Sequence, residues 1–208
     1  MTPGRESRRT EVHLASFQND WYDPGANALV RSAWMLLGSL FLSSWFPWPS
    51  ALKCTLLRAF GARVGKGVII KPRVNVKYPW RLTVGDYSWI GEGVWIDSLA
   101  LVRIGSNACL SQGVMIETGN HDWSRISFDL KVKSVVIEDG AWAAVKSLLL
   151  PGAHLATHAV LGAGAVLAGD TEPYGIYTGV PARKVKERVI EPESSHAEGS
   201  LSQAANVL

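Results

Sequence analysis

The chain has 208 residues, enough for one domain with a large hydrophobic core. Its net charge of +3 is modest, and its basic residues form no dense stripe of the kind that binds nucleic acid. Cys54 and Cys109 lie in apolar surroundings, and a chain of this size does not need disulfides for stability. These features argue against a nucleic-acid-binding or disulfide-stabilised protein and indicate free thiols in a cytoplasmic protein.

The N-terminal segment, residues 1–26, is polar and rich in charge. It lacks the basic-then-apolar pattern of a secretory signal, and we expect its start to be poorly ordered.

The next segment carries no charge from residue 32 to residue 52. Its length alone would admit a membrane span, but Pro47 and Pro49 break a helix and several serines dilute the hydrophobicity. We therefore predict two helices, at residues 27–46 and 50–60, within a helical segment that spans residues 27–61.

Three placements are open for this helical segment. The first is packing against the start of the following domain or against a neighbouring subunit. The second is peripheral membrane contact through residues 27–52, with Trp34, Trp45 and Trp48 at the lipid headgroups on the inner face of the membrane. The third is a true membrane span.

Aliphatic residues recur every six positions through most of the remaining chain. The residues in phase are Val64, Ile70, Val76 and Leu82; Val84, Ile90, Ile96 and Val102; Ile104, Leu110 and Ile116; and Ile137, Ala143, Leu149, Leu155, Leu161 and Leu167. A period of six fits neither an α-helix nor an isolated strand, so each hexad predicts a short strand and a turn. Three hexads then form a triangular coil, and stacked coils bury the aliphatic residues. The fold class is therefore all-β, a parallel solenoid over residues 62–188 with an N-terminal helical segment.

Small residues mark the corners of the predicted coils. Glycines that directly follow the aliphatic position suit the turning of the backbone there: Gly65, Gly85, Gly91, Gly105 and Gly162. Four places after the aliphatic position, the later hexads have room only for a small side chain near the axis: Ala141, Ser147, Ala153, Ala159 and Ala165.

The hexads stop between Ile116 and Ile137, and the loop at residues 118–135 begins Thr118-Gly119-Asn120-His121-Asp122-Trp123. Such an excursion adds little stability to a solenoid, so it is a candidate for function. His121 is the imidazole of this loop, and an unperturbed imidazole has a pKa of about 6.5, suitable for accepting a proton.

These residues resemble the hexapeptide-repeat acyltransferases, whose members form a left-handed parallel β-helix. The resemblance implies the handedness; the spacing does not. It also implies that His121 is a general base, which removes the acceptor's proton as the hydroxyl oxygen attacks the thioester of acetyl-CoA. The reactive imidazole nitrogen and the group that orients the ring stay open. No metal is expected.

The C-terminal coils carry a second resemblance to this family, in Trp142-Ala143-Ala144-Val145, Leu150-Pro151-Gly152-Ala153, Leu161-Gly162-Ala163-Gly164-Ala165-Val166 and Gly179-Val180-Pro181-Ala182-Arg183. In the family, such coils line a groove between the subunits of a homotrimer. The resemblance implies contacts to the pantetheine arm from Trp142, Ala144, Gly162 and Ala163, and contacts to the CoA phosphates from Arg183 and either Lys184 or Lys186. Ala144 and Ala156 depart from the family's usual glycines.

Residues 49–129 resemble, more narrowly, exopolysaccharide acetyltransferases of the colanic-acid type. The matching stretches are Leu57-Arg58-Ala59-Phe60-Gly61-Ala62, Lys71 to Trp80, Gly85 to Glu92, Trp95-Ile96-Asp97 and Gly119 to Trp123. This likeness implies O-acetylation of a sugar hydroxyl on a nucleotide-linked or lipid-linked glycan precursor. Aromatic faces and polar groups suit a saccharide, which makes Trp95, Trp123, Asp97 and Asn120 the acceptor-binding candidates.

Two other functions remain open. Trimeric carbonic anhydrases of the same architecture bind zinc through three histidines, and His121, His154 and His158 are the histidines of the coil region. A non-enzymatic scaffold would use the solenoid faces for interaction. Residues 189–208 show no period, and we expect a flexible tail.

Overall fold

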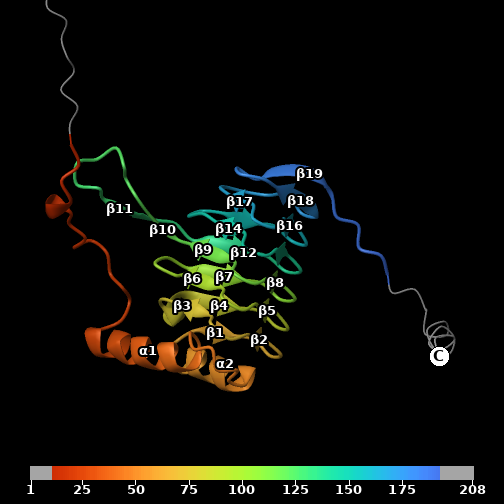
Figure 1. Cartoon of the computed structure of the whole chain (residues 1–208), viewed down its shortest axis with the longest axis horizontal. Helices are drawn as coiled ribbons and strands as arrows, with labels where there is room; N and C mark the ends of the chain where they lie inside the picture. Colours follow the sequence, from red (N-terminus) through yellow and green to blue (C-terminus); the bar gives the residue numbers. More distant parts are fainter. Residues whose placement is uncertain (1–10, 193–208) are drawn as a thin grey trace, which may run out of the picture.

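The computed structural model describes residues 11–192. It consists of a parallel β-solenoid with two helices across one end (Figure 1). Residues 1–10 and 193–208 lie outside the described part, so the predictions of a poorly ordered start and a flexible tail fall largely on them.

Three sheets of five, seven and five strands form the sides of the solenoid. The first contains β1 (Arg63–Val64), β4 (Leu82–Val84), β7 (Val102–Ile104), β12 (Val135–Ile137) and β15 (His154–Leu155). The second contains β2 (Ile69–Ile70), β5 (Trp89–Ile90), β8 (Cys109–Leu110), β13 (Trp142–Ala143), β16 (Val160–Leu161), β18 (Gly175–Thr178) and β19 (Arg183–Glu187). The third contains β3 (Asn75–Val76), β6 (Trp95–Asp97), β9 (Met115–Glu117), β14 (Leu148–Leu149) and β17 (Val166–Leu167).

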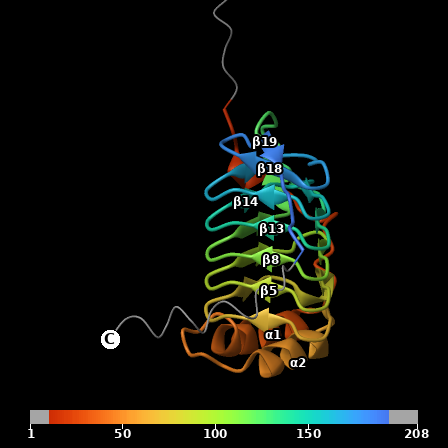
Figure 2. The same ribbon diagram turned by 90° about the vertical axis from the view of Figure 1, so that its right-hand side faces the viewer.

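The strand register places the hexad residues above one another. In the first sheet, Val64 pairs with Val84, Val84 with Ile104, Ile104 with Ile137 and Ile137 with Leu155. The aliphatic positions are buried along the axis, except for the half-buried Val64 in the first coil. Figure 2 shows the resulting stack of coils. The predicted parallel β-helix is therefore confirmed, and the small residues four places on are buried as well.

The corners turn differently from the prediction. The glycines directly after the aliphatic residue do not have positive φ angles; the left-handed residue lies two places later, as at Gly67 (φ 65°) and Tyr87 (φ 57°). A Cβ on Gly91 would lie 2.7 Å from the carbonyl oxygen of Leu110 in the next coil. These first glycines are therefore needed for close stacking of the coils rather than for turning.

Helix α1 (Ala28–Phe41) ends five residues before the predicted end, and α2 (Ser50–Ala59) follows the two prolines as expected. The backbone after α1 bonds instead to the first coil: Val74 N–H donates to the Leu42 carbonyl at 3.0 Å, and Arg73 N–H donates to the Ser44 carbonyl at 3.0 Å. These tertiary hydrogen bonds replace the helical ones, which explains the early end.

Both helices pack against the first coil, as the first placement predicted. Trp34 is 3% exposed and donates from Nε1 to the Val76 carbonyl at 2.8 Å, so the second placement, at lipid headgroups, does not hold for this residue. Lys53 of α2 is fully buried, and its ammonium donates to the carbonyls of Ile70 and Lys71 at 3.2 and 2.9 Å. No helix within residues 11–192 is long and apolar enough to cross a membrane.

The N-terminal segment before α1 runs along the side of the solenoid towards the loop that interrupts the hexads (Figure 1). It contains a short 3₁₀ turn, Leu14–Ser16, and a second 3₁₀ turn, Pro79–Arg81, lies in the first coil. Tyr22 donates to the Leu99 carbonyl at 2.8 Å, and Trp80 donates to the Pro24 carbonyl at 2.8 Å. These contacts bring residues near the chain start to the side of the loop.

Candidate active site

The interruption of the hexads is an antiparallel hairpin at the corner that follows the third sheet. Strand β10 (Gly119–His121) pairs with β11 (Leu130–Val132), and the register places His121 opposite Leu130. The hairpin returns to the solenoid at β12. His121 is thus held by strand pairing, while the residues between the two strands form the exposed end of the loop.

The His121 ring is oriented by Phe128. Its Nδ1 lies 2.8 Å from the Phe128 carbonyl oxygen, and the two rings stack with centroids 4.4 Å apart and planes within 7°. A carbonyl oxygen only accepts hydrogen bonds, so the proton of the neutral imidazole is on Nδ1. The unprotonated Nε2 is then the nitrogen that can accept a proton.

Asp122 does not orient this ring. Its carboxylate lies 2.8 Å from Lys131 Nζ and accepts hydrogen bonds from the backbone and hydroxyl of Ser124. The Lys131 ammonium, followed by the Ser124 hydroxyl, lowers the pKa of Asp122 to about 2. Asp122 therefore remains ionised at neutral pH and fastens one strand of the hairpin to the other.

A cavity of about 440 Å³ opens beside His121. Its lining is partly aromatic and partly polar: Phe17, Asn19, Tyr22, Pro24, Arg31, Lys77, Tyr78, Leu99, His121 and Leu130. The Asn19 side-chain oxygen is buried and has no hydrogen-bond partner within the described part of the chain. The cavity thus offers ring faces and cationic donors next to an imidazole.

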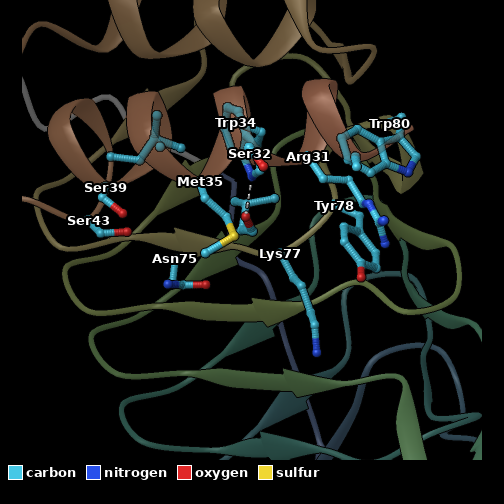
Figure 3. Close-up of a pocket in the computed structure, with 14 residues that line it drawn as sticks. Arg31, Ser32, Trp34, Met35, Ser39, Ser43, Asn75, Lys77, Tyr78 and Trp80 are labelled. Atoms are coloured by element: carbon cyan, nitrogen blue, oxygen red, sulfur yellow. Dashed lines mark hydrogen bonds between the residues drawn. The ribbon is translucent and has the colours of Figure 1, made fainter. Parts of the chain in front are cut away.

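A larger cavity, of about 480 Å³, lies between α1 and the first coil (Figure 3). Its lining includes Trp34 and Met35 of α1, and it shares Arg31, Lys77 and Tyr78 with the cavity beside His121. The two hollows are therefore adjacent, and the basic side chains lie at their junction.

Asp97 holds Lys77 at this junction. Asp97 is 8% exposed, and its carboxylate lies 3.0 Å from Lys77 Nζ. Glu117 occupies the matching position in the next coil. Burial, and next the charge and hydrogen bond of Asp97, raise the pKa of Glu117. The carboxylates of Asp97 and Glu117 and the ammonium of Lys77 therefore influence one another's charge.

None of the four acceptor-binding candidates, Asp97 included, lines the His121 cavity in this chain. The side-chain oxygen of Asn120 accepts a hydrogen bond from the His121 backbone at 2.8 Å. Trp95 is on the outer face of the third sheet and is 45% exposed, and Trp123 is 81% exposed near the hairpin end. The structure brings Phe17, Tyr22 and Tyr78 to the site instead. No sequence pattern identified these three residues as part of the site, because they lie outside the loop that contains His121.

The predicted cofactor residues gather at another corner, the one before the third sheet. Trp142 pairs with Val160, and the Ala144 N–H donates to the Leu161 carbonyl at 2.8 Å, which places Ala144 beside Gly162. Trp142 is exposed and donates from Nε1 to Ser111 at 2.9 Å. Ala163 is also exposed at this corner.

The basic candidates lie on the last strand, β19, where Arg183 and Lys186 are both exposed. Lys184 forms ion pairs with Glu172 and Glu187, each at 2.5 Å, so its charge is already matched within the chain.

The three histidines of the coil region do not meet. His154 Nε2 lies 2.9 Å from a Glu138 carboxylate oxygen, and His158 stacks on Tyr174 at another corner with centroids 4.9 Å apart. Between residues 11 and 192, no group of three His, Cys, Asp or Glu side chains is placed to hold a metal ion.

Comparisons with known proteins identify the class of this fold. No protein-family model matches the chain. Its structure aligns with a TM-score of 0.71 to a hexapeptide-repeat acetyltransferase of Vibrio cholerae O1 biovar eltor in complex with acetyl-CoA. The two are 22% identical, over 80% of this chain and 92% of that one. A maltose O-acetyltransferase from Clostridium difficile 630 aligns with a TM-score of 0.70 and 24% identity, over 79% and 90% of the chains.

A relative at the sequence level is more similar. The chain is 33% identical over 171 residues to a protein of Escherichia coli K12 named as the colanic acid biosynthesis acetyltransferase WcaF. That match covers 79% of this chain and 91% of the relative. The chain therefore belongs to the hexapeptide-repeat acetyltransferase family, as its motifs predicted.

Proposed function

We propose that this acetyltransferase moves an acetyl group from acetyl-CoA to a sugar hydroxyl of a glycan precursor in exopolysaccharide biosynthesis. The observation that carries the proposal is the free Nε2 of His121 beside a cavity with aromatic and polar walls. The likeness to WcaF supports the acceptor class. We place the protein in the cytoplasm, where the free thiols of Cys54 and Cys109 remain reduced.

The reaction needs a base and no covalent enzyme intermediate. His121 Nε2 removes the proton from the sugar hydroxyl as its oxygen attacks the thioester carbonyl carbon. The new C–O bond forms, the C–S bond breaks, and the proton on Nε2 passes to the departing thiolate. The Phe128 carbonyl stabilises the imidazolium formed in between, because it accepts a hydrogen bond from the Nδ1–H throughout.

The acceptor occupies the cavity beside His121. Tyr22 and Tyr78 provide faces on which a sugar ring can stack. Lys77, held by Asp97, and Arg31 supply cationic donors that suit a phosphate or a carboxylate on the precursor.

The complete site requires two subunits of a homotrimer. The corner with Ala144, Gly162 and Ala163 precedes the third sheet, whereas the hairpin with His121 follows it. One protomer therefore carries these two groups at different corners, and packing of neighbouring protomers brings the cofactor corner of one to the hairpin of the next. The small side chains leave room there for the pantetheine arm, and Arg183 and Lys186 meet the CoA phosphates.

The test is thiol release from acetyl-CoA with a panel of sugar and glycan-precursor acceptors. We expect His121→Asn to lower kcat by about 10²–10⁴-fold, the usual contribution of a general base, without loss of the trimer. His158→Asn is the matched control: it makes the same change at a corner where φ is 54°, which asparagine tolerates. Undiminished activity of His121→Asn, or no thiol release with any acceptor, would refute the proposal.

A further inference from the structure

Helix α1 is apolar on two opposite sides, and only one of them is covered by the solenoid. Trp34 and Gly38 face the first coil and are buried. On the other side, Leu29, Leu36 and Leu40 are 82%, 71% and 52% exposed. Their spacing of seven and four residues places them on one stripe along the helix. Figure 1 shows that this helix lies across the end of the solenoid, with its far side turned away from the coils.

The connection between the helices extends the apolar surface. Trp45 is 79% exposed and Phe46 is 47% exposed, and both directly precede the two prolines. Large aromatic side chains of this kind favour the boundary between water and the lipid headgroups.

The same end of the molecule carries exposed cations. Between Asp23 and Asp86 the chain has nine lysines and arginines and no aspartate or glutamate. Three of the nine are not free at the surface, because Lys53 is buried and Arg73 and Lys77 pair with acidic residues of later coils. The whole chain has 21 basic and 18 acidic residues, so the rest of it has only twelve basic residues against all of the acids. Arg63, Lys66 and Lys71 are exposed on the first coil, directly above the helices.

We propose that this basal surface, formed by the outer side of α1, residues 42–49 and the first coil, docks on a membrane that contains anionic lipids. The leucine stripe enters the headgroup region, and the surrounding cations meet the lipid phosphates. Helix α1 has 14 residues, about 21 Å at 1.5 Å per residue, so it lies in the plane of the interface.

The charge also argues against a second copy of this chain as the occupant. In a two-fold contact each patch meets its own copy, so the basic residues of one protomer would face those of the other. An anionic surface removes this repulsion. The inference can be tested apart from the proposed acetyl transfer, because Leu36, Leu40 and Trp45 do not line the His121 cavity.

Flotation of the full chain with lipid vesicles tests this proposal without acetyl-CoA. We expect binding to vesicles of phosphatidylglycerol and phosphatidylcholine, weak binding to phosphatidylcholine alone, and release as salt is raised. The double variant Leu36→Glu/Leu40→Glu is expected to bind the anionic vesicles roughly ten-fold or more weakly. Trp45→Glu, a change outside the helix, should weaken binding in the same direction.

The matched control is Val185→Glu/Val189→Glu, which adds the same charge at exposed positions on or just after β19, at the other end of the solenoid. It should bind as the unaltered chain does. Equal losses in both double variants, or no binding to anionic vesicles, would overturn the proposal. So would a change of oligomeric state in the Leu36→Glu/Leu40→Glu protein at unchanged thermal stability, because the stripe would then be a protein interface.

Discussion

At the scale of single residues, a backbone group orients the His121 side chain. The loop motif identified the imidazole, because the interruption of a regular repeat marks the chain locally. Its orienting partner is the Phe128 carbonyl, and every residue has a carbonyl, so the sequence carried no signal for it. Asp122, the nearest acidic residue, is instead paired with Lys131.

The protonation of Glu117 makes the stability of the folded state depend on pH. Its pKa is raised above the ordinary value of 4.5, chiefly by burial and then by the charge of Asp97. A raised pKa means that the folded state binds the proton more tightly than the unfolded state does. The stability contributed by protonated Glu117 is therefore complete below pH 4.5 and is lost as the pH rises through the raised pKa.

Glu117→Gln should remove the loss of stability that accompanies a rise in pH. We expect thermal unfolding to show little difference between Glu117→Gln and the unaltered chain near pH 4, and a higher Tm for the variant near pH 7. Glu172→Gln, a change of an exposed carboxylate, is the control. A Tm difference for Glu117→Gln that does not vary with pH would show that folding does not raise the pKa of Glu117.

At the scale of elements, the hexad period predicted nearly every strand of the solenoid, because each coil buries its own aliphatic residues. The end of α1 was not predictable in the same way. Local sequence would continue the helix to the prolines, but hydrogen bonds from Arg73 and Val74 of the first coil capture the backbone. The N-terminal segment also contacts the hairpin, where the His13 N–H donates to the Ile126 carbonyl at 3.0 Å. This contact was not predictable either, because it joins residues far apart in the chain.

Lys53 tests how α2 is fastened to the first coil. Its buried ammonium is hydrogen-bonded to the carbonyls of Ile70 and Lys71. Lys53→Met keeps the length and apolar stem but leaves both carbonyls without this donor, so we expect a loss of about 1–3 kcal/mol in the free energy of unfolding. Denaturant unfolding measures it, with Thr55→Ala as a control on the exposed side of α2. Equal effects of the two changes would mean that the buried ammonium contributes nothing specific.

At the scale of the whole molecule, the sequence predicted the axis of the solenoid better than its surfaces. Aliphatic residues that face the axis repeat with a fixed period, whereas the surfaces that we propose for acceptor, cofactor, subunit and lipid follow no period. The excess of basic over acidic residues at positions 24–85 is visible in the sequence. It indicates a binding surface only because the fold places these residues together at one end of the solenoid.

We propose that His121 and the Ala163 corner act together across a subunit boundary. The activity of mixed oligomers tests this proposal. Ala163→Trp fills the proposed cofactor corner at an exposed position, and His121→Asn removes the proposed base, so each variant alone should be inactive. When the two are refolded together, a site has both intact groups in about a quarter of random pairings, and about a quarter of the normal activity should return. If the mixed trimers are no more active than either variant alone, or if the Ala163→Trp protein is active, the site is not shared between subunits in this way.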